Sequence, residues 1–579
     1  MSDKMINLKI NGMAVSVKEG TTVLEAAREV GIKIPTLCYL KGLNEIAACR
    51  ICVVEVKNAR SLVTACVYPV NEGMEVFTNS EKVIQSRKMT LELILSDHNK
   101  SCLSCSRSGN CELQTLCNEY GVDQMKFIGA ANTFKLDKST SWLVRDNNKC
   151  ILCKRCVAAC KNQDVAVIDA INRGFVTHIG SAFEQDLNEV SCVACGQCIN
   201  VCPTGALQEK DNIDDVIKAI ADPTKHVVVA TAPSVRVAIG EEFGNPIGTN
   251  AEGQMVAALK RMGFDKVFDI DFSADLTIME EAYEFLGRVK NNGVLPMFTS
   301  CSPGWIRYIE HYYPELLPNL SSCKSPQQMF GAVIKTYYAQ KNNLDPKDIV
   351  MVGVMPCTAK KFEITRDDQN AGGVPDIDIV LTTRELARLI KRKGVDFNNL
   401  PKEEFDNPLG VGSGAGLIFG VTGGVMEAAL RTAVEALTGE ELKKLDFTDV
   451  RGFEGIKEAK YTINGLEIKV AVASGLDNAK KVCDLVKSGK ADYQFIEIMC
   501  CPGGCINGGG QPIVNADIRN NVDYRALRAG ALYSTDEKMT LRKSHDNPFI
   551  KQLYKEFFGE PNSHKAHEVL HTSFVARKK

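Results

Sequence analysis

The feature that most constrains this chain is a set of cysteines grouped near its N-terminus. Of the 23 cysteines in the 579 residues, fifteen fall into three spaced groups within the first 202 residues. Two thiolates separated by two residues can bind one metal from a single loop. Structural disulfides are rare in reducing compartments, so this density indicates metal sites rather than a disulfide scaffold. We therefore expect three metal-binding modules ahead of a larger domain.

The overall composition is ordinary for a soluble globular protein, with 45% hydrophobic and 24% charged residues. The formal net charge of −2 does not suggest binding to nucleic acid or to an anionic membrane surface. No apolar run approaches the ~18 residues of a spanning helix, and the first residues lack the basic-then-apolar pattern of a signal peptide. We expect a cytoplasmic protein of several domains, at ~150 residues each.

Residues 1–80 are predicted to form a small sheet around a two-iron cluster. Asn11 and Gly12 form a tight turn between two strand-like segments, and Thr22 to Glu25 has the pattern of a capping box that begins a helix. Four cysteines follow, with ten, two and thirteen residues between them: Cys38, Cys49, Cys52 and Cys66. Zinc accepts the same ligands. The order of hairpin, helix and cysteines resembles the plant-type ferredoxin (β-grasp) fold, which favours [2Fe–2S].

Residues 81–125 carry a second group, in which a histidine precedes three cysteines. Its members are His98, Cys102, Cys105 and Cys111. A lone histidine is usually structural, but one placed four residues before a cysteine pair is expected to be a ligand. The pattern resembles the His/Cys3 [4Fe–4S] module of complex I's large iron–sulfur subunit and of iron-only hydrogenases. Neutral imidazole in place of a thiolate tends to raise the reduction potential of such a site.

Residues 140–210 contain the same four-cysteine run twice. The first run is Cys150, Cys153, Cys156 and Cys160, and the second is Cys192, Cys195, Cys198 and Cys202. In two-cluster ferredoxins the fourth cysteine of each run binds the other cluster. We therefore expect Cys202 to join the first three cysteines of run one, and Cys160 to join the first three of run two. Two zinc knuckles are the alternative, which the duplicated pattern disfavours.

Residues 211–579 have a different sequence pattern. Apolar runs of strand length at 226–232 and 267–270 flank a helix-like segment at 255–262, which predicts α/β layers. No Gly-x-Gly-x-x-Gly lies at a strand–helix junction, so a built-in nicotinamide or flavin site is not indicated. Three cysteine-bearing segments stand out, at residues 299–305, 355–363 and 497–512. Their cysteines would converge only in the folded chain, where flanking glycines let backbone approach a bulky cofactor.

These three segments resemble the signature loops of [FeFe]-hydrogenases, and the preceding modules match the long clostridial type of that family along essentially the whole chain. The resemblance implies a multidomain α/β and α+β protein. Its expected parts are a β-grasp [2Fe–2S] ferredoxin-like domain, a His/Cys3 [4Fe–4S] module, a two-cluster bacterial ferredoxin-like domain and a large α/β H-cluster domain. The H-cluster is a [4Fe–4S] cube bridged by a cysteine to a two-iron unit with CO, CN⁻ and azadithiolate ligands.

The activity implied by this resemblance is the reversible reaction 2H⁺ + 2e⁻ ⇌ H₂. Ferredoxin or flavodoxin is the implied electron partner, and hydrogenase maturation proteins are the implied source of the cofactor. The resemblance implies a monomer, and from the charge and the apolar runs described above we expect no nucleic-acid or membrane partner.

The resemblance also implies roles for residues of the larger domain. The cube ligands are matched by Cys357, Cys501 and Cys505, and Cys505 also matches the bridge to the two-iron unit. Lys360 matches the lysine that pairs with a cyanide, and a buried ammonium is favourable beside an anionic ligand. The pocket lining is matched by Ala232, Pro233, Gln327, Met355, Phe419 and Met499. A dry lining would protect the metal from side reactions.

Proton delivery is implied at five further positions. They are Cys301, Glu281, Ser321, Glu284 and Arg288. Residues 279–288 are predicted to be helical, and there Glu281, Glu284 and Arg288 share one face. Such spacing alone more often marks a solvated salt-bridge face. With the resemblance, the stripe is expected to pass protons along hydrogen bonds.

The first loop departs from the family at one metal ligand. The family reads Thr-Ser-Cys-Cys-Pro, whereas residues 299–303 read Thr-Ser-Cys-Ser-Pro, so that Ser302 stands in place of the fourth cube ligand. A hydroxyl is harder and far less acidic than a thiol, and iron–sulfur sites favour thiolate. Four alternatives stay open: Ser302 binds as an alkoxide, Cys323 or Cys500 (both usually alanine in the family) supplies the sulfur, Cys301 moves to bind, or the cube is labile.

Our leading hypothesis is a ferredoxin-linked [FeFe]-hydrogenase whose accessory clusters pass electrons in line to the H-cluster. The rival is a low-activity or redox-sensory homologue, which Ser302 favours and Lys360 disfavours. A complex-I-type subunit would use the first 210 residues in the same way, but it leaves the three later loops unexplained.

Overall fold

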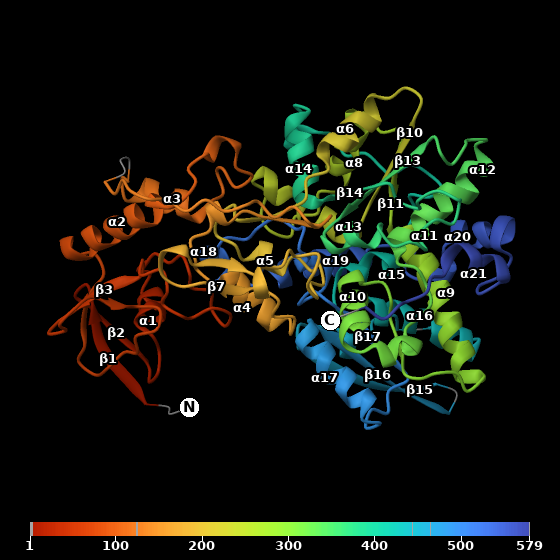
Figure 1. Cartoon of the computed structure of the whole chain (residues 1–579). Helices are drawn as coiled ribbons and strands as arrows, with labels where there is room; N and C mark the ends of the chain where they lie inside the picture. The colour runs from red at the N-terminus through yellow and green to blue at the C-terminus, as the bar shows by residue number, and fades with distance from the viewer. Residues whose placement is uncertain (1–3, 123–125, 443, 464, 578–579) are drawn as a thin grey trace.

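The computed structural model describes residues 4–122, 126–442, 444–463 and 465–577. The outermost residues of three predicted domains, at 1–3, 123–125 and 578–579, lie outside the described residues. The N-terminal modules form an arm on one side of the larger C-terminal region (Figure 1). Within the described ranges, no helix is both long enough and apolar enough to cross a membrane.

The N-terminal module is a five-stranded sheet in the order β2-β1-β5-β3-β4. Its elements are β1 (Met5–Ile10), β2 (Met13–Lys18), α1 (Val23–Glu29), β3 (Val53–Val56), β4 (Val63–Thr64) and β5 (Glu75–Phe77). The predicted hairpin is confirmed, with β1 and β2 antiparallel across the Asn11 turn. Only half of the predicted capping box forms. The Thr22 hydroxyl accepts the Glu25 amide at 3.3 Å, whereas the Glu25 carboxylate binds Arg28 and Lys41.

The next two modules are built mainly from loops held by short elements. These are α2 (Glu81–Ser96), α3 (Glu112–Glu119), β6 (Leu143–Arg145), α4 (Arg155–Asn162), β7 (Asp169–Ile171), β8 (His178–Gly180), α5 (Gln197–Asn200) and β9 (Leu207–Glu209). The antiparallel pair β6–β9 joins the two ends of the ferredoxin-like module. The helices α4 and α5 each begin inside a cysteine run, so they hold the two runs side by side.

The C-terminal region contains two four-stranded sheets, which confirms the predicted α/β layers. The first, in the order β11-β10-β13-β14, is fully parallel and consists of β10 (His226–Thr231), β11 (Lys266–Asp269), β13 (Ile349–Met355) and β14 (Ile379–Thr382). The second has the order β12-β17-β16-β15 and consists of β12 (Met297–Phe298), β15 (Ile456–Ile463), β16 (Leu466–Ser474) and β17 (Phe495–Met499). Only β15 is antiparallel to its neighbour.

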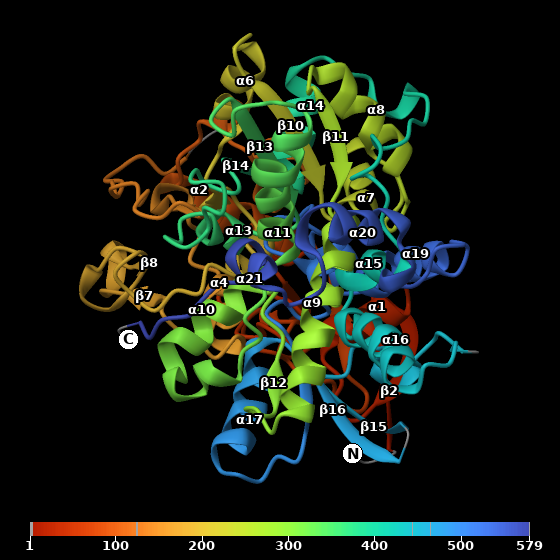
Figure 2. The same ribbon diagram turned by 90° about the vertical axis from the view of Figure 1, so that its right-hand side faces the viewer.

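Helices surround both sheets (Figure 2). They are α6 (Ile213–Ala221), α7 (Pro233–Arg236), α8 (Glu252–Met262), α9 (Asp271–Lys290), α10 (Pro303–Tyr312), α11 (Pro326–Val333), α12 (Ala339–Lys341), α13 (Ala359–Glu363), α14 (Thr383–Arg392), α15 (Gly414–Leu417), α16 (Gly424–Thr438), α17 (Leu476–Lys487), α18 (Ala516–Arg519), α19 (Tyr524–Asp536), α20 (Pro548–Leu553) and α21 (His564–Leu570).

The strands of the second sheet are apolar on both faces because helices cover both. Ala471 and Ala473 of β16 pack with α10 and α17, whereas Val470 and Val472 pack with α9 and α16. Successive side chains of a strand point to opposite faces, and a sheet buried on both sides needs apolar residues at every position. The α9 helix is consequently an interior helix, with residues 271–278 all buried.

The strand order of the first sheet determines where a ligand can bind. The chain leaves β10 toward β11 on one side and returns to β13 on the other. In open parallel sheets, ligands bind beyond the carboxyl ends of the strands at such a switch in direction. The segments at this position are Ala232–Pro233 after β10 and residues 356–358 after β13.

The ferredoxin-like module packs directly against the C-terminal region. Arg384 of α14 forms a buried ion pair with Glu209 of β9, with Nη2 to Oε2 at 2.6 Å. Gly196 has a φ of 67°, and a Cβ atom there would lie 2.4 Å from Thr358 Oγ1 and 2.9 Å from the Gly509 Cα. Only a residue without a side chain allows this approach. The second cysteine run therefore lies against the loops after β13 and β17.

Candidate functional site

The four cysteines of the first module converge. The Cys52 and Cys66 sulfurs lie 3.3 Å apart, and the Cys38 and Cys49 thiols are close neighbours. The nearby Cys38 thiol lowers the pKa of the Cys49 thiol to about 6. Two facing pairs of buried sulfurs supply four ligand atoms, as the sequence predicts for this module.

The second module gathers Cys102, Cys105 and Cys111 around the start of α3. Burial lowers the pKa of His98 to about 4, and its Nδ1 is buried without a hydrogen-bond partner among the described residues. Metal binding requires a neutral imidazole with an available nitrogen. His98 has both properties, and its role as a ligand stays a prediction.

The structure separates the eight ferredoxin-type cysteines into two sets of four. One cavity is lined by Cys150, Cys153, Cys156 and Cys202. A second cavity is lined by Cys160, Cys192, Cys195 and Cys198. The fourth cysteine of each run thus lies with the other run, in the grouping that the sequence predicts.

The cysteine sites form a fork rather than the line expected from their order in the sequence. The Asn44 side chain donates to the carbonyls of both Cys38 and Cys153, at 2.7 and 3.1 Å, so the first site adjoins the third. The second site also adjoins the third, because a Cβ atom at Gly205 would lie 2.5 Å from the Cys105 sulfur. Sequence order cannot reveal such lateral contacts between loops.

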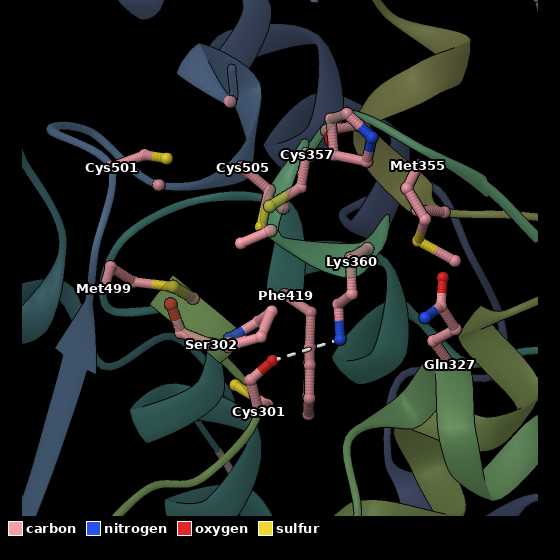
Figure 3. A pocket seen from close by; sticks show the side chains of 18 of the residues that line it. Cys301, Ser302, Gln327, Met355, Cys357, Lys360, Phe419, Met499, Cys501 and Cys505 are labelled. Carbon is pink, nitrogen blue, oxygen red and sulfur yellow. Dashed lines mark hydrogen bonds between the residues drawn. The ribbon is translucent and has the colours of Figure 1, made fainter. Parts of the chain in front are cut away.

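A buried apolar cavity lies beyond the carboxyl ends of β10, β13 and β17 (Figure 3). Its lining is predominantly apolar, as is usual for a ligand-binding site. All six residues predicted for the lining border it: Ala232, Pro233, Gln327, Met355, Phe419 and Met499. The cavity is also bordered by Cys195, Cys301, Ser302, Cys357, Lys360, Cys500, Cys501 and Cys505.

Cys357, Cys501 and Cys505 reach this cavity from two different sheets (Figure 3). Cys357 follows β13 of the first sheet, whereas Cys501 and Cys505 follow β17 of the second. Burial raises the pKa of the Cys505 thiol to about 12, and the nearby Cys501 sulfur adds to this rise. Thiols that converge on an apolar space suit a metal cluster, because metal binding deprotonates thiols that burial otherwise keeps neutral.

Lys360 contributes a positively charged side chain to the lining of the cavity. Its ammonium forms a buried ion pair with Glu363 at 3.0 Å and donates to the Cys301 carbonyl at 3.3 Å (Figure 3). Gln327 donates to Glu363 at 3.0 Å, and its Oε1 atom is buried without a hydrogen-bond partner among the described residues. An unpartnered buried amide oxygen and a buried ammonium fit a polar ligand in this apolar space.

The structure distinguishes the two cysteines proposed to replace the missing thiolate at Ser302. Cys323 does not border the cavity, and its sulfur lies 3.7 Å from Glu284 Oε2. The expectation that Cys323 could substitute as a ligand is therefore wrong, because its side chain points to the helix α9 instead. Cys500 does border the cavity, and its backbone amide donates to the Ser302 hydroxyl at 3.3 Å.

The predicted proton-relay residues lie between the cavity and the outer part of α9. Cys301 borders the cavity, and the nearby Glu281 carboxylate adds to the effect of burial in raising the pKa of its thiol. Ser321 donates to Glu284 at 3.2 Å, and Glu284 pairs with Arg288 at 2.6 Å. The Glu284 and Arg288 side chains are 12% and 16% exposed, so this end approaches solvent.

Glu281 excludes the alternative of a solvated salt-bridge face. It is fully buried, and neither carboxylate oxygen has a hydrogen-bond partner among the described residues. Burial raises its pKa to about 8, an effect that the nearby Ser321 hydroxyl partly offsets. A carboxyl group that titrates near neutral pH can both accept and donate protons, and such groups concentrate at functional sites.

Two residues beside the relay were not predicted from the sequence. His571, just after α21, binds Ser322 at 2.8 Å through Nδ1 and Glu280 at 3.1 Å through Nε2. The Ser322 hydroxyl in turn donates to Glu284 at 3.1 Å. His571 and Ser322 lie 249 residues apart, and no local sequence pattern links them.

Comparisons with known families assign every one of these regions. "Iron only hydrogenase large subunit, C-terminal domain" matches residues 225–509, and "Iron hydrogenase small subunit" matches residues 522–577. The N-terminal matches are "2Fe-2S iron-sulfur cluster binding domain" at 3–81, "NADH-ubiquinone oxidoreductase-G iron-sulfur binding region" at 87–126 and "4Fe-4S dicluster domain" at 149–206. The small-subunit segment, fused here to the same chain, was not anticipated from the sequence.

Similar proteins extend over the whole length. The "NADP-reducing hydrogenase subunit HndD" of Solidesulfovibrio fructosivorans is 49% identical, covering 99% of this chain and 100% of that protein. "Iron hydrogenase 1" of Clostridium pasteurianum is 46% identical, covering 98% and 100%. A solved structure of HydA(deltaEFG), described as revealing stepwise [FeFe]-hydrogenase H-cluster assembly, is 45% identical with a TM-score of 0.57, covering 63% of this chain and 99% of that one.

Proposed function

We propose that the cavity is the site of reversible proton reduction and that the N-terminal modules supply the electrons, because this chain belongs to the iron-only ([FeFe]) hydrogenase family. The chain is an oxidoreductase acting on hydrogen, with 2Fe–2S, 4Fe–4S and H-cluster binding regions. The observation that carries the finer proposal is the convergence of three distant loops on one apolar cavity. Those loops bring thiols, one ammonium and the start of a proton relay to the same space.

The residues around the cavity fit the H-cluster. We assign Cys357, Cys501 and Cys505 to the cube, and Cys505 also to the link with the two-iron unit. When bound, the H-cluster with its CO, CN⁻ and azadithiolate ligands supplies the redox chemistry of 2H⁺ + 2e⁻ ⇌ H₂. Lys360 would hold an anionic ligand, while the ion pair with Glu363 holds the ammonium in place. The apolar lining would exclude water.

Protons would reach the cavity along the relay that ends at Cys301. Arg288 and Glu284 form its outer end, Ser321 joins Glu284 to the interior, and Glu281 is the buried carboxyl next to Cys301. Hydroxyl, carboxyl and thiol groups can each accept a proton from one side and release one to the other. The pKa of about 8 lets Glu281 exchange protons near neutral pH at low cost.

Electrons would enter through either of two N-terminal sites. We assign a [2Fe–2S] cluster to the first module and three [4Fe–4S] clusters to the His98 site and the two ferredoxin-type sites. The contacts at Asn44 and Gly205 support two separate entrances to the Cys150 site. The Cys160 set borders Thr358, whose hydroxyl donates to the Ala194 carbonyl at 2.7 Å, and this set would be the exit to the cavity.

Ferredoxin or flavodoxin is the electron partner that we propose first. A second candidate is a partner subunit that reduces NADP⁺, because the 49%-identical relative is named as a subunit of an NADP-reducing hydrogenase. Since no nucleotide-binding pattern is apparent in this sequence, nucleotide reduction would need another chain. Hydrogen-dependent reduction of purified ferredoxin by the isolated chain would support the first. Reduction of NADP⁺ only after addition of a co-purified subunit would support the second.

We also propose that the isolated chain is a monomer and that maturation proteins build the two-iron unit. Infrared spectroscopy of the matured protein is the decisive test of the whole function. We expect bands from CO and CN⁻, together with hydrogen turnover in the presence of a reduced dye. Full iron loading without these bands would refute the H-cluster assignment. The redox-sensory alternative is not favoured, because full-length relatives bear hydrogenase names.

A further inference from the structure

The thiol set of the cavity leaves one cube ligand unassigned. A [4Fe–4S] cube is bound by four protein ligands, usually thiolates. Three are assigned above, and three further cysteines border the cavity: Cys195, Cys301 and Cys500. Cys195 belongs to the Cys160 set of the ferredoxin-like module. Cys301 lies at the end of the cavity where the Lys360 ammonium meets its carbonyl, away from the Cys501 sulfur (Figure 3).

Cys500 lies beside the assigned ligands. Its thiol lies close to the thiols of Cys501 and Cys195, and the residue is 3% exposed. It directly follows β17, so its backbone is held by the sheet. A ligand at this place would let one short loop, residues 500–505, provide three of the four sulfurs.

Gly304 provides the space that the Cys500 thiol occupies. A Cβ atom at Gly304 would lie 2.7 Å from the Cys500 sulfur and 3.3 Å from its Cβ atom. Gly304 is the second residue of α10 and does not have a positive φ, so its backbone does not require glycine. Glycine in a helix costs about 0.5–1 kcal/mol relative to alanine. A side chain at position 304 would therefore disturb the contact with Cys500.

Ser302 supports Cys500 rather than competing with it. Its hydroxyl accepts the Cys500 amide at 3.3 Å, which links the start of α10 to the end of β17. A serine hydroxyl stays protonated under conditions where a metal-bound thiol is deprotonated, and iron–sulfur sites favour the softer sulfur ligand. The two residues thus face each other across one hydrogen bond, with the better ligand on the β17 side.

We propose that Cys500 is the fourth thiolate ligand of the cube, that Ser302 positions it through its backbone amide, and that Gly304 leaves room for its sulfur. This assignment rests on the proposed function for the cavity. In this arrangement the cube ligand Cys500 also contacts Cys195, so the cavity and the nearest ferredoxin-type site share a sulfur–sulfur contact. Of the two alternatives that the sequence leaves for a direct substitute, the structure supports Cys500 over Cys323.

The test compares the iron content and the cube's spectrum in three single variants of the full-length protein. We expect Cys500→Ala to lose about four iron atoms per chain, the content of one cube, together with its electron paramagnetic resonance signal. Ser302→Ala should retain the four irons with a shifted signal, because the Cys500 amide loses its acceptor. Cys323→Ala is the matched control, because it removes an equally buried thiol outside the cavity. Full iron and an unchanged signal in Cys500→Ala, or loss of the cube in Ser302→Ala alone, would overturn the proposal.

A second set of variants removes the risk that Cys500→Ala merely folds poorly. The double variant Ser302→Cys/Cys500→Ala should recover the four irons with a shifted signal, because it returns a thiol to the facing position. Gly304→Ala should reduce cube content in the wild-type background but not in the double variant, where no sulfur occupies the space. An effect of Gly304→Ala that depends on the presence of the Cys500 thiol indicates that the two residues are in direct contact. A double variant as iron-poor as Cys500→Ala would overturn the proposal.

These measurements are independent of the test of function. Infrared bands in the unaltered protein report whether the cavity holds the H-cluster. Iron content and the magnetic signal of the variants report which residue binds the cube. Absence of the bands would therefore refute the proposed function, while the iron content and magnetic signal of the variants would still show which residue binds the cube.

Discussion

Replacement of Glu281 by glutamine tests the proton relay and the electrostatics of α9 together. Glu281 is fully buried, and its pKa is raised from 4.5 to about 8. Between these values the unfolded chain releases the proton while the folded chain keeps it. Stability therefore falls as pH rises through this window, and the whole cost is present only above pH 8. A shift of this size corresponds to about 5 kcal/mol, of which about 3 kcal/mol is present at pH 7.

Glu281→Gln removes this pH-dependent cost because the amide does not titrate. Between pH 5.5 and 7.5, the stability of the variant relative to the unaltered protein should rise by about 2–3 kcal/mol. For a domain of roughly 350 residues this is a relative rise of about 4 °C in the thermal midpoint. Hydrogen turnover should fall by about 100-fold or more, which is the usual contribution of one positioned proton-transfer group. The variant is thus expected to be more stable at neutral pH and far less active.

The assay is differential scanning calorimetry of both proteins at several pH values, paired with hydrogen evolution from a reduced dye. Glu280→Gln is the matched control on the same helix. It removes a buried carboxyl group that accepts hydrogen bonds from Tyr554 and the Asn562 amide and contacts His571, so it should lower the thermal midpoint and change turnover only a few-fold. A midpoint difference for Glu281→Gln that is independent of pH would refute the raised pKa. Turnover within about three-fold of normal would refute the relay.

Three further substitutions test other parts of the structure. Cys301→Ala should leave iron content and infrared bands intact while lowering hydrogen turnover by about 100-fold, and normal turnover would contradict its role. Lys360→Met leaves the buried Glu363 carboxylate unpaired, so calorimetry should show a loss of about 3–5 kcal/mol, and infrared spectra should show reduced cofactor. If both are unchanged, the ion pair has no such role. Gly196→Ala should destabilise the protein by about 2 kcal/mol or more, whereas Gly20→Ala, with a similar positive φ but open space, should cost only about 1 kcal/mol of backbone strain. Equal effects on the thermal midpoint would show that the Thr358 contact is not tight.

The sequence predicts those parts of the site that depend on local spacing. The two ferredoxin runs, the hairpin at Asn11 and the helical face of α9 are all local patterns, and the structure contains them. What the sequence cannot predict is how distant segments meet. Glu281 has the spacing of a surface residue, yet it is buried because α9 packs between α16 and α11. The contact between Gly304 and Cys500 and the bond between Ser322 and His571, which lie 249 residues apart, likewise join distant segments.

The cavity lies between two sheets, so a cofactor bound in it would connect them. Cys357 and Lys360 belong to the loop and helix after β13, whereas Cys501 and Cys505 belong to the loop after β17. A cofactor bound by both sets of residues is a cross-link between two separately hydrogen-bonded sheets. Since a ligand that binds only the folded state stabilises it by mass action, the two halves should unfold together when the cofactor is bound and separately when it is not. Assembly of the catalytic centre would then also be the last step in joining the two halves of the domain.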